Sequence, residues 1–354
     1  MKHIRSIYVI LTILMVFTTL THQGCRSAQQ AKEPDADGFA LLINHIEHHH
    51  DFVNSEVAPG AIGIDAVLNY EGDKMLLIDI RPLPEFQSGH LAEAVNITME
   101  GLLDYFELSI DPAGFDTIVI ISTDGQDALF ATTLMRLLGY DNVFGLRLGM
   151  GWHKQFADTV WGRKLSSEYE LRLSPGPSPQ LEAFAYPAFQ SDGKDGYTLL
   201  RERARELLRS GYKDYRIAAK EVFAAADSFY IINYWPENEY LIGHIPGARQ
   251  YTPKKSLSRK TSLNTLPPDK PIVIYCHQGN MSSSATAYLL LLGYDVKSLE
   301  FGSNSFMYNL HKGKIGRNIF DPLQAIDYPL MDKSNSGKIP KVPVLVEIKS
   351  QGGC

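Results

Sequence analysis

The chain has few cysteines and no large excess of charge of either sign. Only three of its 354 residues are cysteines, so no disulfide framework can hold the fold together. The formal net charge of −6 argues against a nucleic-acid partner bound through its phosphates. With 44% hydrophobic and 21% charged residues, the chain is not compositionally disordered and is long enough to bury about two domain cores.

The N-terminal apolar run is short for a membrane-spanning helix, which needs about 20 residues. This run, residues 7–20, follows the basic residues Lys2 and Arg5 and precedes small and polar residues, which is the order of an export signal. The pair Gly24-Cys25 then resembles a bacterial lipoprotein site, in which the cysteine is lipidated and becomes the new N-terminus. Cys25 is therefore the predicted lipidation site.

We accordingly expect a lipoprotein-type signal peptide over residues 1–25 and a polar tether over 26–38. The predicted location is the bacterial cell envelope, on its periplasmic or extracellular side, with the lipid anchor as the contact with the membrane. An ordinary cleaved signal or an uncleaved anchor, with Cys25 incidental, is the alternative. His22 supports that alternative, because lipoprotein sites usually have an aliphatic residue at its position.

Two parts of the chain repeat one another. LLIDIRPLPEFQSGH (76–90) and TIVIISTDGQDALFATTLMRLLGY (117–140) match YIINYWPENEYLIGH (230–244) and PIVIYCHQGNMSSSATAYLLLLGY (271–294). The matched positions are 154 residues apart in both pairs. This constancy indicates a duplicated domain and not a short-period solenoid.

Each copy has the same order of elements. An apolar, strand-like run is followed by turn residues and a Gly-His pair. A second apolar run then enters a glycine-containing loop and an apolar-periodic helix that ends in Leu-Gly-Tyr. Continuous apolar strands joined through helices predict a parallel sheet covered on both faces. The expected fold class is α/β, with two domains that each have a parallel-stranded sheet and helices on both faces.

Composition places the boundaries of these domains. We expect the first domain over residues 39–162, a proline-rich linker over 163–195, the second domain over 196–330 and a polar tail over 331–354.

The second copy contains the candidate nucleophile, Cys276, which directly follows an apolar strand. The loop and helix start that come next are His277, Gln278, Gly279, Asn280, Met281 and Ser282. Amides of such a loop can converge above a helix N-terminus, and the helix dipole adds to the stabilisation of negative charge there. The same field favours a thiolate, so Cys276 is the predicted nucleophile and 277–282 the predicted substrate-binding loop. An inert core cysteine is the alternative.

The segments ENEYLIGHIPGA (237–248), YCHQG (275–279) and LLGYD (291–295) resemble the rhodanese family, and the resemblance covers most of residues 40–325 as two copies. It implies that Cys276 takes a sulfane sulfur from a donor such as thiosulfate or a persulfide. The resulting persulfide would be cradled by residues 277–281 and passed to a thiophilic acceptor. The implied ligand is a small sulfur-containing anion or thiol, with no metal and no cofactor. A protein partner remains open.

The second copy departs from the family pattern at two places. Met281 stands where many active members have an arginine, and Asn233 and Trp235 stand where the first copy has Asp79 and Arg81. The second copy therefore lacks charges that would help to bind an anion. Nearby basic residues could supply a diffuse positive field or form a solvated basic loop: Lys254, Lys255, Arg259 and Lys260.

The first copy is predicted to be catalytically inactive. Ser122 occupies the cysteine position, and a hydroxyl cannot form a persulfide. Asp124 and Asp127 also place two carboxylates where an anion would bind, and like charges at that range repel. We expect this domain to serve stability, docking or gating.

Other functions have weaker support in the sequence. A non-catalytic scaffold lipoprotein at the membrane surface, with Cys276 vestigial, is the main alternative. A phosphatase or arsenate reductase on a related fold would need a longer loop ending in arginine, and Ser282 occupies the corresponding place. The histidines between His45 and Asp51 could suggest a metal, but a solvated helix end explains them, and we predict no metal site.

Overall fold

The computed structural model describes residues 37–49 and 51–332. The signal peptide, Cys25, nearly all of the tether and nearly all of the tail lie outside the described residues, so the predictions for them stay predictions.

The first copy forms a five-stranded sheet in the order β1-β5-β4-β2-β3. Every strand pair in it is parallel. The strands are β1 (Ala61–Ile62), β2 (Met75–Asp79), β3 (Val95–Asn96), β4 (Thr117–Ile121) and β5 (Val143–Leu146).

The second copy repeats this topology in the order β6-β10-β9-β7-β8, again with every pair parallel. Its strands are β6 (Arg216–Ile217), β7 (Tyr230–Asn233), β8 (Arg249–Gln250), β9 (Ile272–Tyr275) and β10 (Val296–Leu299). The α/β fold class and the duplication are thereby confirmed.

The central strands explain why these sheets are parallel and covered. Four consecutive residues of β4 and all of β9 are buried, and most of them are isoleucine or valine. β-Branched side chains suit a pleated surface, and burial of successive residues requires cover on both faces.

Helices flank the strands in both copies. In and before the first copy they are α2 (Gly38–His49), α3 (Ile64–Leu68), α4 (Leu83–Ser88), α5 (Leu102–Leu108), α6 (Gln126–Leu137) and α7 (Lys154–Val160). The later ones are α8 (Gly196–Ser210), α9 (Ala219–Ala224), α10 (Glu237–Tyr240), α11 (Asn280–Leu291) and α12 (Tyr308–Leu310). Within residues 37–49 and 51–332, no helix is long and apolar enough to cross a bilayer.

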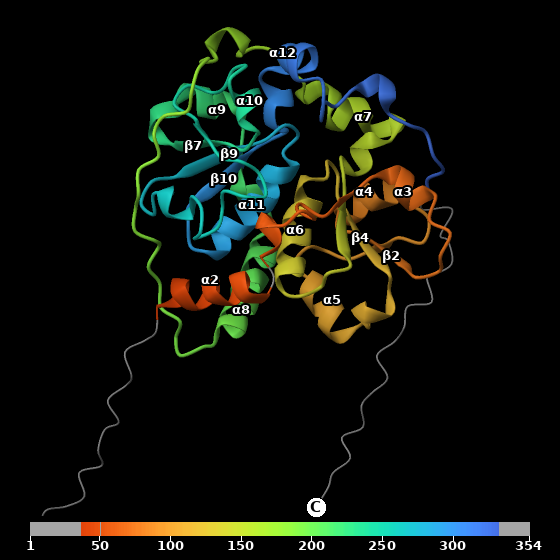
Figure 1. Cartoon of the computed structure of the whole chain (residues 1–354). Coiled ribbons are helices and arrows are strands. Elements are labelled where there is room, and N and C mark those ends of the chain that lie inside the picture. Colours follow the sequence, from red (N-terminus) through yellow and green to blue (C-terminus); the bar gives the residue numbers. More distant parts are fainter. Residues whose placement is uncertain (1–36, 50, 333–354) are drawn as a thin grey trace, which may run out of the picture. The chain divides into compact units, whose positions relative to one another are not determined.

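The two copies pack directly on one another through α6 and α11, which lie side by side in Figure 1. Thr133 of α6 donates from its hydroxyl to the hydroxyl oxygen of Ser284 on α11, at 2.8 Å, and both residues are buried. Buried apolar residues of both copies form one continuous core. The helix that follows each nucleophile-position loop therefore also forms the interface between the copies.

Two segments outside the repeated sheets pair with the Gly-His pairs of the two copies. Ser174 of the linker forms an antiparallel bridge with His244 of the second copy, and Met331 near the chain's end forms the equivalent bridge with His90 of the first. In each case a backbone amide donates to a backbone carbonyl at 2.9 Å, from Ser174 to His244 and from His90 to Met331. Each Gly-His corner thus receives a connecting segment.

Candidate active site

Cys276 lies at the carboxyl end of β9, directly before the loop that enters α11, and only 2% of it is exposed. Its Sγ accepts a hydrogen bond from the Ser282 backbone amide at 3.4 Å and one from the Ser282 hydroxyl at 3.5 Å. The Ser282 oxygen in turn accepts from the Ser298 hydroxyl at 2.8 Å. The first turn of α11 therefore presents the Ser282 amide to the sulfur, and the Ser282 hydroxyl shares its one hydrogen between the sulfur and the Gly279 carbonyl oxygen, which is 3.1 Å away. The helix dipole also favours negative charge at this place.

Two glycines fix the loop around Cys276. Gly279 precedes α11 with φ of +84°, a left-handed conformation, and a Cβ there would meet Gln126 Oε1 of the first copy at 2.3 Å. Gly302 also has a positive φ, and its Cβ would lie 2.2 Å from the Cys276 carbonyl oxygen. That carbonyl accepts from the Ser303 amide at 3.0 Å. Close backbone approach from the loop after β10 thus holds the nucleophile loop in place.

His277 is fixed by a carboxylate and an aromatic ring. Its Nε2 lies 2.8 Å from Glu239 Oε2, and its ring stacks on Trp235 with centroids 5.0 Å apart. Glu239 is also paired with Arg317. Burial raises the pKa of Glu239, but the hydrogen bonds and charges of His277 and Arg317 outweigh burial and lower that pKa overall. Glu239 is therefore ionised at neutral pH.

A second histidine, His311, packs against the ring of His277. His311 is fully buried, its ring centroid is 5.0 Å from that of His277, and its Nδ1 lies 2.7 Å from the Ser303 hydroxyl oxygen. Burial and the neighbouring His277 lower the pKa of His311 to about 4, so this imidazole is neutral at neutral pH.

Cys276 borders a cavity of about 240 Å³ to which both copies contribute. From the second copy the lining residues are Lys254, Cys276, His277, Gln278, Asn280, Met281 and Asn318; from the first they are Ala58, Pro59, Ala61 and Arg147. An adjoining cavity of about 500 Å³ shares Lys254, His277, Met281 and Asn318 with it. Of the predicted loop residues, four therefore face the cavity, while Gly279 forms the turn and Ser282 is buried behind the sulfur.

The basic segment 254–260 contributes only in part. Lys254 and Lys255 line these cavities, whereas Arg259 is paired with Glu47, with 2.7 Å between guanidinium nitrogen and carboxylate oxygen. Lys260 lines neither of the two cavities. The expected diffuse positive field thus reduces to two lysines.

Sequence reasoning missed four residues at this site: Glu239, Arg317, Asn318 and Arg147. Glu239 lies inside the segment that carries the family resemblance, and it is one of the two buried residues of α10. The other three follow elements that reach the cavity only through the tertiary fold, and no local pattern marks them.

Asp79 and Arg81, the charged residues that the second copy lacks, do not provide an unpaired positive charge in the first copy. Arg81 and Asp79 form a buried ion pair, with 2.7 Å between nitrogen and oxygen, and Arg81 also donates to the Gly89 carbonyl at 2.8 Å. The expectation that losing this pair weakens anion binding is therefore not supported by the geometry. In the second copy, Trp235 replaces Arg81 and stacks on His277 instead.

The first copy keeps the loop geometry around its serine. The Ser122 hydroxyl oxygen accepts from the Gly125 amide at 3.1 Å and from the Ala128 amide at 3.2 Å. Its two acidic residues are bound to Arg216 at the start of β6, Asp124 at 2.6 Å and Asp127 at 3.1 Å. The carboxylates predicted to repel an anion instead form an ion cluster between the copies.

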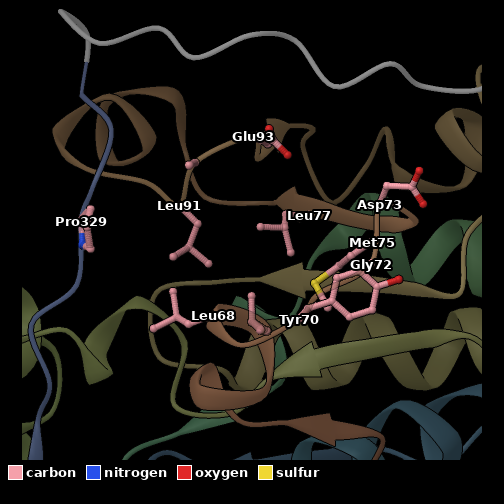
Figure 2. Close-up of a pocket in the computed structure, with 11 residues that line it drawn as sticks. Leu68, Tyr70, Gly72, Asp73, Met75, Leu77, Leu91, Glu93 and Pro329 are labelled. Atoms are coloured by element: carbon pink, nitrogen blue, oxygen red, sulfur yellow. The ribbon is translucent and has the colours of Figure 1, made fainter.

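A separate groove of about 350 Å³ lies on the first copy. Figure 2 shows the side chains of Leu68, Leu77 and Leu91 gathered in it, with the carboxylates of Asp73 and Glu93 farther out. No cysteine, histidine or basic residue lines this groove, so it offers no group for sulfur transfer.

The histidines near the N-terminal end of the described chain belong to one helix. In α2, the rings of His45 and His49 stack with centroids 4.4 Å apart, and His49 Nδ1 lies 2.9 Å from the His45 carbonyl oxygen. In the part of the chain that the structure describes, no group of three or more His, Cys, Asp or Glu side chains is placed to hold a metal ion.

Several solved structures are similar to the chain. A thiosulfate sulfurtransferase from Pseudomonas aeruginosa is 16% identical over 76% of this chain and 46% of its own, with a TM-score of 0.28. SseA from Escherichia coli, described among 3-mercaptopyruvate sulfotransferases, is 18% identical over 68% of this chain and 97% of its own, with a TM-score of 0.24. A rhodanese-related protein from Thermoplasma volcanium is 19% identical over 33% of this chain and 96% of its own, with a TM-score of 0.24.

No curated protein sequence matches the chain. The family model for the rhodanese-like domain matches twice, over residues 65–155 and 219–308, which together make up just over half of the chain. Each match contains four of the five strands of one sheet and one nucleophile-position loop, with Ser122 in the first and Cys276 in the second. The chain therefore belongs to the family of rhodanese-like domain proteins, with two such domains in tandem.

Proposed function

We propose that the chain is a sulfurtransferase that moves a sulfane sulfur through a persulfide on Cys276. The observation that carries this proposal is the position of the thiol. Cys276 lies at the end of β9, receives two donors from Ser282 and borders a cavity of about 240 Å³. A buried cysteine with no chemical role would need neither the donors nor the cavity.

In the first half-reaction, the Cys276 thiolate attacks the outer sulfur of a donor such as thiosulfate. A bond forms between Sγ and that sulfur while the sulfur–sulfur bond of the donor breaks, and sulfite leaves with the electron pair. In the second half-reaction, the thiolate of an acceptor attacks the outer persulfide sulfur and releases Cys276 as a thiolate. No oxidant or reductant is consumed beyond donor and acceptor.

The surroundings of Cys276 suit both steps. The Ser282 amide and hydroxyl, with the N-terminus of α11, stabilise negative charge on the thiolate. His277 has one ring nitrogen bound to Glu239 and lies at the wall of the same cavity. This fixed imidazole offers a polar contact to an acceptor that enters the cavity.

The proposal is tested by intact-protein and peptide mass spectrometry after treatment with thiosulfate or polysulfide. We expect Cys276 to gain the mass of one sulfur atom and a Cys276→Ser variant to gain none and to lose sulfur transfer. If Cys276 is alkylated readily by iodoacetamide yet never gains sulfur, the sulfurtransferase proposal is wrong.

A non-catalytic scaffold is the second candidate, and one observation favours it. Met281 occupies the position where many active members of the family have arginine, and it lines the cavity beside Cys276. A cavity without sufficient positive charge would bind anionic donors weakly. Under this alternative, Cys276 would remain unmodified in the experiment above.

A further inference from the structure

We infer that the inactive first copy supplies the anion-binding residue of the second copy's site, and that this residue is Arg147. The ligand that fits is a sulfur donor with a negatively charged group and a small apolar body. This inference rests on the proposed function, because it names the donor class for Cys276.

The position of Arg147 is set by the sheet of the first copy. It directly follows β5, and its backbone amide donates to the Ile62 carbonyl of β1 at 2.9 Å. Its side chain lines the same cavity as Cys276. Among the residues that the structure describes, its guanidinium has no hydrogen bond or ion pair, so its charge is available to a ligand.

The other cations near Cys276 are engaged by acidic residues. Lys254 donates to the Glu56 carbonyl, and its Nζ is also 3.8 Å from the Glu56 carboxylate. Arg317 is paired with Glu239. Lys255 lines only the adjoining cavity. Within residues 37–49 and 51–332, Arg147 is therefore the arginine or lysine with an uncompensated charge on the cavity that contains Cys276.

The remaining walls indicate an apolar body on the ligand. Ala58, Pro59 and Ala61 of the first copy line one part of the cavity, and Met281 of the second copy lines another. An arginine in place of Met281, in the first turn of α11, would have placed a positive charge in the same copy as the thiol. Here the charge comes from the other copy, and the space beside the thiol is left apolar. Thiosulfate has no group to fill that space, whereas an organic thiosulfonate has one.

The chemistry balances for benzenethiosulfonate as donor. The Cys276 thiolate attacks the outer sulfur, the new sulfur–sulfur bond forms, and the bond between that sulfur and the sulfonyl sulfur breaks. Benzenesulfinate leaves with the electron pair, so one anion is consumed and one is released. Arg147 attracts the anion in binding and takes no proton.

The test compares two alkylating agents of nearly equal size, anionic iodoacetate and neutral iodoacetamide, on the full chain. The rate of modification of Cys276 by each is followed by peptide mass spectrometry. We expect Arg147→Gln to lower the iodoacetate-to-iodoacetamide rate ratio about five- to tenfold, and Arg147→Lys to restore most of it. Arg163→Gln is the control, because Arg163 is an exposed arginine directly after the first copy that lines neither cavity at Cys276.

Steady-state kinetics then tests the apolar body. We expect wild-type protein to have a higher kcat/KM for benzenethiosulfonate than for thiosulfate, and Arg147→Gln to raise KM for both donors. An unchanged alkylation ratio in Arg147→Gln, or an equal fall in Arg163→Gln, overturns the anion site. A higher kcat/KM for thiosulfate than for benzenethiosulfonate would overturn the inference that the donor has an apolar body.

The same measurements separate this inference from the proposed function. If the alkylation ratio falls in Arg147→Gln but Cys276 of the wild type never gains sulfur, the anion site stands and the sulfurtransferase proposal fails. If Cys276 gains sulfur while the ratio is unaffected by Arg147→Gln, the proposed function stands and Arg147 has no part in it.

Discussion

At the scale of single residues, the two copies differ at the nucleophile position but keep the same backbone arrangement around it. Ser122 and Cys276 each follow a central strand, and each accepts from an amide in the first turn of the next helix, Ala128 and Ser282 respectively. The arrangement of these backbone amides is therefore common to both copies. The side chain at this position, serine or cysteine, decides whether a persulfide can form.

The first prediction concerns Ser122. Ser122→Ala should leave sulfur transfer nearly unchanged, because no step passes through the first copy's hydroxyl. It should lower the free energy of unfolding by about 1–2 kcal/mol, since the buried amides of Gly125 and Ala128 lose their shared acceptor. Transfer assays and urea unfolding measure the two effects, and a variant that loses transfer while keeping its stability would contradict this division of roles.

The second prediction concerns Gly279. Gly279→Ala should cost at least about 2 kcal/mol, because alanine is strained at a φ of +84° and its Cβ would meet Gln126 Oε1 at 2.3 Å. Gly313→Ala is the control, since a Cβ at Gly313 has no atom within 4 Å and should change stability by less than about 0.5 kcal/mol. Equal effects of the two substitutions in urea unfolding would show that the contact with Gln126 is absent.

At the scale of elements, the loop that contains Ser122 is also part of the interface between the copies. Arg216 at the start of β6 bonds Asp124 and Asp127. Burial lowers the pKa of Arg216, but the negative charges of Asp124, Asp127, Tyr212 and Glu300 together raise it above its ordinary value. Burial, then the charge of Asp124, raises the pKa of Asp127 to about 6, although Arg216 lowers it. Asp124 has the shorter bond to Arg216, so we assign it the ion pair and treat Asp127 as the group held back from ionising.

This assignment predicts a pH dependence. Because the pKa of folded Asp127 lies above its ordinary value of 3.8, the folded state binds this proton more readily than the unfolded state. Ionisation of Asp127 therefore costs stability above about pH 6, and the cost disappears as the pH falls from about 6 to about 4.

Asp127→Asn should consequently be more stable than wild type by about 1–2 kcal/mol near pH 7.5, and the difference should close near pH 4.5. Free energies of unfolding of both proteins at the two pH values provide the measurement. A variant that is less stable near pH 7.5, with a deficit that shrinks on acidification, would mean that ionised Asp127 stabilises the fold.

At the scale of the whole molecule, the two copies depend on each other. The linker pairs with His244 of the second copy, the segment near Met331 pairs with His90 of the first, and one apolar core runs through both. The cavity at Cys276 has walls from both copies, with Arg147 from the first. The first copy, which lacks the cysteine, therefore still forms part of the wall of the cavity at Cys276.

The last prediction concerns the attachment of the whole molecule to a membrane, and its support is the order of basic, apolar and Gly-Cys residues at the N-terminus. Full-length chain produced in a bacterium should carry acyl chains on Cys25 and partition into the detergent phase. Cys25→Ser should stay unacylated. An intact Met1, or a mature form in the aqueous phase with unmodified Cys25, would contradict the lipoprotein proposal.

The sequence by itself determined the architecture of this protein. Apolar runs, turn glycines and a constant repeat distance are local signals, and they sufficed to predict two parallel sheets and a loop between β9 and α11 with Cys276 at its start. Strand period, helix period and turn chemistry act over a few residues, which is why one sequence reveals them.

Only the tertiary structure decided which charges remain available at the site. Arg81 is paired within its own copy, Arg259 is paired with Glu47, and Arg147 reaches the cavity of the other copy. Arg81 is paired with Asp79 only two residues away, but Glu47 and Arg259, like Glu239 and Arg317, are far apart in the chain and meet only in the folded structure. The free charge of a basic residue is set by its neighbours in space, and the local sequence pattern does not contain them.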